Sequence, residues 1–324
     1  MHYVATFFKN RRVLHPVLGV LLEGLLISCC LLILLFFVSK KQDITRKLHS
    51  LPADEKFFME AFFRILISTD NGSYVLFGDK PASLMVYKEW QSYDLHPVSH
   101  FPSDTDFSPE RKGFEIWQKY QHLFPSKTYT FLKIGSCFSD HLTAVFFIHN
   151  ERLLKVLSKN FIDFHRIFPQ FKSSECLLNA MLNDSSILHQ ICNKYDLLLG
   201  IILGFGKDNA ALFERKMEID AFLFPQKFYS REPYLKQPFL RPVPRLGFAT
   251  LEEELDAIEI KSEGVIEGVD IPGIDWALHL PLGFLVDKEK TDLVQLRTRL
   301  KQDLIKATSA YRNGNFLQVT LNEL

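Results

Sequence analysis

Residues 13–38 form the longest apolar run of the chain, and Glu23 is the one charged residue within it. A helix needs about 20 largely apolar residues to cross the hydrocarbon core of a bilayer, where it satisfies its own backbone polar groups. The run therefore predicts one transmembrane helix over residues 13–38. A basic tail over residues 1–12 precedes it, and a juxtamembrane linker over residues 39–50 follows it. The membrane lipid bilayer is thus the first predicted partner of the chain.

Glu23 is unusual for such a position. An ionised carboxylate inside a transmembrane helix costs about 2.5–3.5 kcal/mol on insertion scales. Glu23 is therefore either part of a contact or a proton-linked site within the membrane, or a tolerated residue that protonates or reaches towards the headgroups. The second interpretation is favoured, because a single helix has no neighbouring helix with which to form a pathway.

A lipoprotein signal is an alternative interpretation of the same run. Residues 26–29, Leu-Ile-Ser-Cys, loosely match a bacterial lipobox, whose cleavage would leave a lipidated Cys29. The charge of Glu23 in the core of that signal argues against processing, and so does the apolar stretch 30–38 after the cut. We expect Cys29 and Cys30 to be small apolar residues of the helix.

The charges that flank the run favour one orientation only slightly. The N-terminal side carries Lys9, Arg11 and Arg12 with the chain amine, and the C-terminal side carries Lys40, Lys41, Arg46 and Lys47. The positive-inside count is therefore nearly even. A short basic tail before one span is typical of a signal anchor, which favours an extracytoplasmic position for the rest of the chain.

Cysteine usage does not decide the compartment. Beyond the run the chain has Cys137, Cys176 and Cys192, an odd number without the spacing of a disulfide framework. We therefore expect no disulfide to organise the fold.

The region from about residue 50 to residue 324 is long enough for one large domain or two smaller ones. The chain balances 38 basic residues against 38 acidic residues, which argues against nucleic acid as a partner. Phenylalanine occurs 30 times, mostly in periodic apolar segments, and this predicts an aromatic-rich core.

Local signals predict an α+β domain over residues 51–224, mainly helical with a small antiparallel sheet. Helices are indicated after Pro52, after the capping pair Ser108-Pro109, over residues 150–168 and in three further stretches up to Phe224. Two hairpins are predicted, one from strands 73–77 and 83–87 and one from strands 129–134 and 143–148.

Residues 225–248 are rich in proline and in basic residues, which predicts an extended connector. The following section, residues 249–324, begins with a capping signature from Thr250 to Glu253 and is acidic up to Asp275. Apolar residues at helical spacing then mark a long amphipathic helix, at Leu293, Leu296, Leu300, Leu304, Ala307 and Tyr311. Because this stripe needs a surface and opposite charges lie close in sequence, we expect the helical section to dock on the core.

Residues 204–207, Gly-Phe-Gly-Lys, resemble a phosphate-binding loop only in part. A Walker A motif needs Gly five residues before its second Gly and Ser or Thr after Lys, where this chain has Ile201 and Asp208. Residues 195–206 are too few to span a bilayer, so they predict a buried core helix that ends at these glycines. Gly200 and Gly204 would allow close helix packing.

The densest cluster of possible metal ligands precedes the second predicted helix, at Asp94, His96, His100, Asp104 and Asp106. Its spacing matches no closed zinc pattern. Interspersed prolines indicate an irregular loop, so a solvated loop is the expected structure.

Cys137, His141, His189 and Cys192 would form a four-ligand set if the second hairpin met the helix that carries His189. Cys137 with His141 also has the residue types of a nucleophile and its base, without an assignable orienting residue. Ordinary turn structure is the expectation here. The sequence assigns no catalytic residue, no metal and no cofactor.

Residues 73–87 (SYVLFGDKPASLMVY) and 197–213 (LLLGIILGFGKDNAALF) resemble segments of uncharacterised membrane-anchored proteins from chlamydia-like obligate intracellular bacteria. The resemblance covers about half of the region after the apolar run. It implies a single-pass protein of a bacterial envelope, in the inner membrane, but it implies no activity and no catalytic residue.

Two classes of function remain open. The first is a non-enzymatic, membrane-anchored interaction or structural protein with a protein partner, favoured because no convergent catalytic constellation is recognisable. The second is a membrane-tethered enzyme, such as a hydrolase, with a site assembled from scattered residues. A pocket with convergent polar groups and shifted pKa values would favour the enzyme. A shallow surface with an exposed apolar patch would favour the interaction protein.

Overall fold

The computed structural model describes residues 25–30, 42–88, 108–138, 142–224, 242–262, 291–312 and 314–324. The chain divides into two compact units, Met1–Leu51 and Pro52–Leu324. In the first unit, residues 25–30 and 42–49 are helical.

Most of the predicted transmembrane segment lies outside the described residues, and Glu23 lies outside them as well. Of that segment the helical residues 25–30 are described, and there Leu25, Leu26 and Ile27 are 66%, 68% and 60% exposed. In the described part of the chain, no helix combines the length and the apolarity that crossing a bilayer demands. The transmembrane helix therefore stays a prediction.

The first two long helices of the second unit begin where the sequence predicts. α3 (Ala53–Ser68) follows Pro52 directly. α5 (Pro109–Tyr120) starts with proline, and the Ser108 hydroxyl accepts a hydrogen bond from the amide of Arg111, as an N-cap residue does. α3 and α5 pack against each other, and the short 3₁₀ helix η2 (Gln121–Leu123) follows α5.

The predicted strand at residues 73–77 is wrong. These residues form a short buried helix, α4 (Gly72–Leu76), which begins after Asn71 in the left-handed region at a φ of 65°. A run of a few apolar residues fits a buried strand and a buried helix equally well, so periodicity could not separate the two. The first predicted hairpin therefore does not exist, and β1 (Ala82–Lys88) pairs with a strand much later in the chain.

The second predicted hairpin is confirmed as β2 (Tyr129–Ile134) and β3 (Leu142–His149). The sheet has three antiparallel strands in the order β1-β3-β2, with Leu84 of β1 opposite Phe146 of β3. Alternate residues of β3 point to opposite faces. Phe146 belongs to a core shared with the later helices, whereas Phe147 stacks on Phe131 with ring centroids 4.8 Å apart. The second face continues through Phe131 to the aromatic side chains of α3 and α5.

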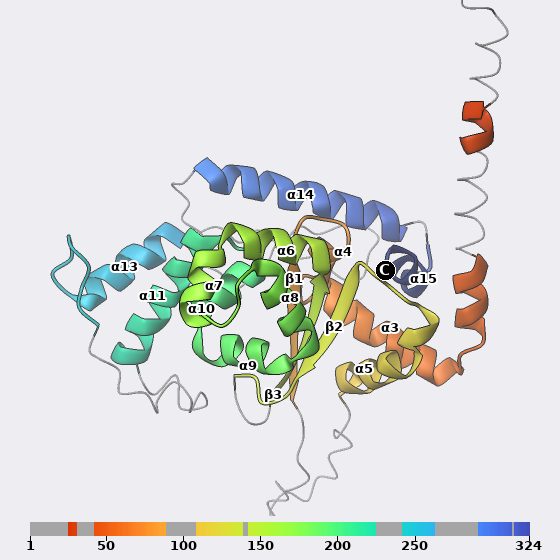
Figure 1. The fold of residues 1–324 in the computed structure, drawn as a ribbon, viewed down its shortest axis with the longest axis horizontal. Helices are drawn as coiled ribbons and strands as arrows, with labels where there is room; N and C mark the ends of the chain where they lie inside the picture. Colours follow the sequence, from red (N-terminus) through yellow and green to blue (C-terminus); the bar gives the residue numbers. More distant parts are fainter. Residues whose placement is uncertain are drawn as a thin grey trace, which may run out of the picture. The chain divides into compact units, whose positions relative to one another are not determined.

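The chain after β3 is helical up to the end of α11 and lies beside the sheet (Figure 1): α6 (Asn150–Lys159), α7 (Phe161–Ile167), α8 (Ser174–Asn183), α9 (Ser185–Lys194), α10 (Asp196–Ile202) and α11 (Lys207–Leu223). The region predicted as one helical stretch, 150–168, is broken at Asn160, whose side chain donates to the carbonyl of Val156. Four helices, not three, then lead to Phe224, because Asp184 caps a new helix instead of continuing the previous one.

Three helices of the C-terminal section are described: α13 (Leu251–Ser262), α14 (Thr291–Arg312) and α15 (Phe316–Glu323). α13 contacts α11, α14 contacts α4, and α15 contacts α3. The amphipathic helix buries Leu304, Ala307 and Tyr311, while the side chains of Leu293 and Leu296 lie outside the described set.

The fold is thus mainly helical with one small antiparallel sheet, an α+β architecture as predicted. The domain limits stay a prediction, because residues 225–241 and 263–290 lie outside the described ranges.

Candidate functional site

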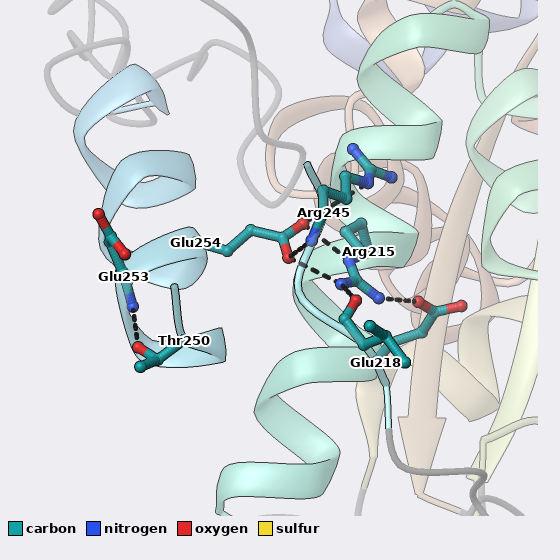
Figure 2. A network of polar contacts seen from close by, with 7 residues as sticks. Arg215, Glu218, Arg245, Thr250, Glu253 and Glu254 are labelled. Carbon is teal, nitrogen blue, oxygen red and sulfur yellow. Dashed lines mark hydrogen bonds and ion pairs between the residues drawn. The ribbon is translucent and has the colours of Figure 1, made fainter. Parts of the chain in front are cut away.

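A buried polar network joins α11 to α13 (Figure 2). Arg215 of α11 donates two parallel hydrogen bonds to Glu254 of α13, from Nε at 2.9 Å and from Nη2 at 2.7 Å. Their side chains are 9% and 1% exposed. Such a bidentate pair combines charge with geometric specificity. Arg215 also donates to the carbonyl of Val243 at 2.7 Å and to Glu218 at 3.1 Å.

Glu254 is held as a carboxylate from two sides. The Arg215 hydrogen bond, with a smaller contribution from the Arg245 amide, lowers the pKa of Glu254 below its ordinary value. That amide donates to Glu254 at 3.0 Å, and the Arg245 guanidinium lies 3.5 Å from the same carboxylate. Because these donors and acceptors bind one another, the network is built to hold segments together rather than to bind a ligand.

Thr250 and Glu253 form the predicted cap at the start of α13, with one shift. The Thr250 hydroxyl accepts from the Glu253 amide at 3.2 Å. The Glu253 carboxylate, however, accepts from the amide of Ala249 at 2.7 Å, one residue earlier than in a standard capping box.

A pocket of about 470 Å³ lies beside this network. Its lining comes from the end of α11, from the segment before α13 and from the start of α13: Phe222, Leu223, Pro242, Val243, Pro244, Ala249, Thr250, Leu251 and Glu252. Glu252 carries the one carboxylate among these residues, and the Thr250 hydroxyl is already bonded in the helix cap. The pocket therefore offers an apolar binding surface rather than a pair of catalytic groups.

Lys80 is the most perturbed cation of the described chain. It is 8% exposed, and burial lowers the pKa of its amine to about 7. The ammonium nitrogen lies 4.3 Å from the ring centroid of Phe205, a position that favours the charged form and so opposes the burial. Two buried hydroxyls of the same region, those of Ser73 and Ser83, have no hydrogen-bond partner in the described part of the structure. Sequence reasoning missed Lys80, because Gly-Asp-Lys-Pro is typical of an exposed turn.

The structure brings together two of the four residues in the possible zinc set. Cys137 and Cys192 are both fully buried in the same apolar core, and a hydrogen bond with Cys137 is the main cause that raises the pKa of the Cys192 thiol. His189 instead shares a hydrogen bond of 3.1 Å with Asn193, and His141 lies outside the described residues. Within the described ranges, no group of three or more His, Cys, Asp or Glu is placed to hold a metal ion.

The partial phosphate loop is a helix–turn–helix connection. α10 ends at Ile202, Gly204 and Gly206 have φ values of 80° and 83°, and α11 begins at Lys207. The Lys207 amine binds the carboxylate of Asp163 at 2.6 Å, so it is occupied by a neighbour of opposite charge. The predicted core helix over 195–206 is thus shorter than expected, because its last residues form the turn.

The remaining candidates of the sequence are only partly described. Cys29 and Cys30 are exposed free cysteines. The cluster from Asp94 to Asp106 lies outside the described ranges.

Comparison of the chain with models of protein families, with curated proteins and with solved structures found no match.

Proposed function

We propose that this chain is a single-pass membrane protein of a bacterial envelope whose folded part is a non-enzymatic interaction or structural protein. The observation that carries the anchor is the helical piece 25–30, which presents Leu25, Leu26 and Ile27 outwards. Large aliphatic side chains exposed side by side are costly in water and favourable in hydrocarbon. They lie within the apolar run 13–38, whose length suits a membrane span.

The pocket beside α11 and α13 supports an interaction role for the folded part. Its lining is largely apolar, and Val243 at its edge and the nearby Leu246 are exposed. An apolar pocket with exposed aliphatic neighbours fits an apolar anchor residue of a protein partner.

Membrane extraction tests the anchor. After an alkaline carbonate wash the full chain should stay in the membrane pellet, whereas a chain that begins at Ser50 should be soluble. Replacing Cys29 by Ser should change neither the retention nor the apparent mass. Complete release of the full chain by the wash would contradict the anchor, and a lipid label lost in the Cys29→Ser variant would establish a lipoprotein instead.

Site-directed photocross-linking in the producing cell tests the partner. A photoreactive residue in place of Leu246 should yield one discrete cross-linked protein. The matched control is the same residue in place of Ile162, which is exposed on α7 and does not line the pocket. Absence of a cross-link from position 246, or the same product from both positions, would contradict a partner at this pocket.

A further inference from the structure

Two cysteines far apart in the sequence meet in the core. Cys137 lies in the turn after β2, and Cys192 lies in the last turn of α9. Both are free thiols with 0% exposure, and Asn193, next to Cys192, binds the backbone of Ser136 and Phe138 on either side of Cys137. Both belong to the same apolar core as the strand β3.

A polar clamp holds Cys137 in this place. Asn193, the residue after Cys192, accepts a hydrogen bond of 2.7 Å from the amide of Phe138 and donates one of 3.1 Å to the carbonyl of Ser136. Its side chain thus binds the backbone on both sides of Cys137. The Cys137 amide itself donates to the carbonyl of Leu142 at 3.0 Å.

The hydrogen bonds of the Asn193 side chain maintain an unfavourable backbone conformation on both sides of Cys137. Ser136 and Phe138 have φ values of 52° and 66°, in the left-handed region that L-residues other than Gly rarely adopt. Such conformations are strained and persist where surrounding contacts enforce them. Cysteines that only fill space in the core would not require these strained conformations. We therefore take the strained turn to indicate a role for the position of Cys137 itself.

We propose that Cys137 and Cys192 form a redox site that closes to a disulfide by exchange with a low-molecular-weight disulfide such as oxidised glutathione. Both thiols are buried, so the exchange requires a local opening of the fold that exposes them. The site is independent of the proposed anchor and of the proposed partner surface.

The exchange takes two steps. The hydrogen bond with Cys137, burial and the charge of Asp196 raise the pKa of Cys192, so this thiol keeps its proton and Cys137 attacks first. The Cys137 thiolate displaces one thiolate from the small disulfide and forms a mixed disulfide. Cys192 then loses its proton, attacks the sulfur of Cys137 and displaces the second thiolate. Two protein thiols are oxidised by two electrons, and one small disulfide is reduced to two thiols.

The bridge would connect the β2–β3 turn to α9 and so lock the sheet to the helical layer. It closes a long loop, which restricts the unfolded chain, so the oxidised protein should melt roughly 5–10 °C higher than the reduced one. The oxidation state of Cys137 and Cys192 would also depend on the compartment, because disulfides persist outside the reducing cytoplasm.

Peptide mapping of the full chain in detergent tests the proposal. The folded protein is equilibrated with oxidised and reduced glutathione, quenched in acid, alkylated and digested. We expect a peptide pair linked through Cys137 and Cys192 that lacks two hydrogens, with Cys176, which is exposed on α8, recovered as a separate alkylated or glutathionylated residue. Recovery of Cys137 and Cys192 as unlinked thiols under oxidising conditions would overturn the proposal. So would bound zinc in stoichiometric amount.

Two variants separate the redox site from simple packing. Asn193→Ala releases the turn and should reduce the linked fraction severalfold at a fixed glutathione ratio. The matched control is Asn183→Ala, an exposed residue at the end of α8, which should leave the fraction unchanged. An unchanged linked fraction in Asn193→Ala would show that the clamp does not position Cys137. If that variant fails to fold, the map of the wild-type chain still decides whether the bridge forms.

Discussion

Gly204 and Gly206 have nearly the same backbone conformation but different surroundings. Both have φ near 80°, where a side chain is strained. A Cβ atom on Gly204 would lie 2.5 Å from Cδ of Pro81, whereas a Cβ atom on Gly206 would meet nothing within 4 Å. Gly204 is thus required for a close approach of the α10–α11 turn to the chain before β1. Sequence reasoning expected close helix packing here, and the neighbour is instead a proline in a loop.

Substituting each glycine by alanine separates the cost of the left-handed backbone conformation from the cost of the close contact with Pro81. Gly204→Ala should lower the free energy of unfolding by roughly 2–4 kcal/mol, because it adds overpacking to the strain. Gly206→Ala should cost only the strain, roughly 1 kcal/mol. Urea unfolding of the chain from Ser50 measures both values, and equal losses would refute the contact with Pro81.

Because of Glu254, the free energy of unfolding should depend on pH in the acidic range. The pKa of its carboxyl is lower in the folded state than in the unfolded chain, where it has its ordinary value near 4.5. The stabilisation is therefore fully present above that value and is lost as the pH falls through the folded pKa. Glu254→Gln should destabilise by about 3 kcal/mol near pH 7, because Arg215 stays buried without its partner charge.

Melting at two pH values checks the prediction for Glu254. The difference between wild type and Glu254→Gln should shrink from about pH 7 to about pH 3.5, because acid removes the charge from the wild type as well. The control is Glu252→Gln, an exposed carboxylate of the same helix, which should stay within about 0.5 kcal/mol of wild type. A difference that stays constant with pH would mean that the Arg215 pair does not depend on the ionisation of Glu254.

At the scale of elements, α14 and α15 are joined by one aromatic residue. The Tyr311 ring stacks on Phe316 with centroids 4.7 Å apart and meets Phe77 edge-on at 5.4 Å. Its hydroxyl shares a hydrogen bond of 3.0 Å with Thr320. Tyr311 therefore links α14 to α15 and to the residue that ends α4.

Tyr311→Ala should weaken the packing of α14 against α15 and against the end of α4. We expect a loss of about 3–5 kcal/mol, as for other large aromatic side chains removed from a core, with faster proteolysis of α14 and α15. Tyr311→Phe removes only the hydroxyl and should cost about 1 kcal/mol. The control Ile305→Ala, at an exposed position of α14, should be nearly neutral. Equal proteolysis rates in Tyr311→Ala and wild type would contradict the link.

At the scale of the whole chain, each C-terminal helix has a contact with an element that precedes the connector. α13 is held by the Arg215–Glu254 pair, α14 by α4 and α15 by α3. The chain has 38 basic and 38 acidic residues, so no excess of one charge repels the C-terminal helices from the rest of the chain.

A nick in the connector should therefore leave the two parts together. Trypsin can cut after Lys227, Arg231 or Lys236 in the chain from Ser50. The two fragments should elute from a sizing column as one species of unchanged size. Glu254→Gln should weaken this association after the same cut, since it leaves the buried Arg215 without a charged partner. Separation of the wild-type fragments would mean that these contacts do not hold the C-terminal section.

The sequence alone determined the elements that depend on local signals. Pro52 and the Ser108-Pro109 pair predicted where α3 and α5 begin, because caps act on neighbouring amides. The stripe from Leu293 to Tyr311 predicted α14, and the alternation around 129–148 predicted the β2–β3 hairpin. The apolar run 13–38 predicts a membrane span from its length and hydropathy, and this span stays a prediction.

Only the tertiary structure decided the features that depend on distant neighbours. Residues 72–76 are a helix and not a strand because buried apolar residues gain similar free energy in either element, so the surrounding core makes the choice. The pairing of β1 with β3, the burial of Lys80 and the meeting of Cys137 with Cys192 each join segments far apart in the chain. Burial and desolvation arise from these three-dimensional neighbours, which local spacing does not encode, and they set both the shifted pKa values and the candidate sites.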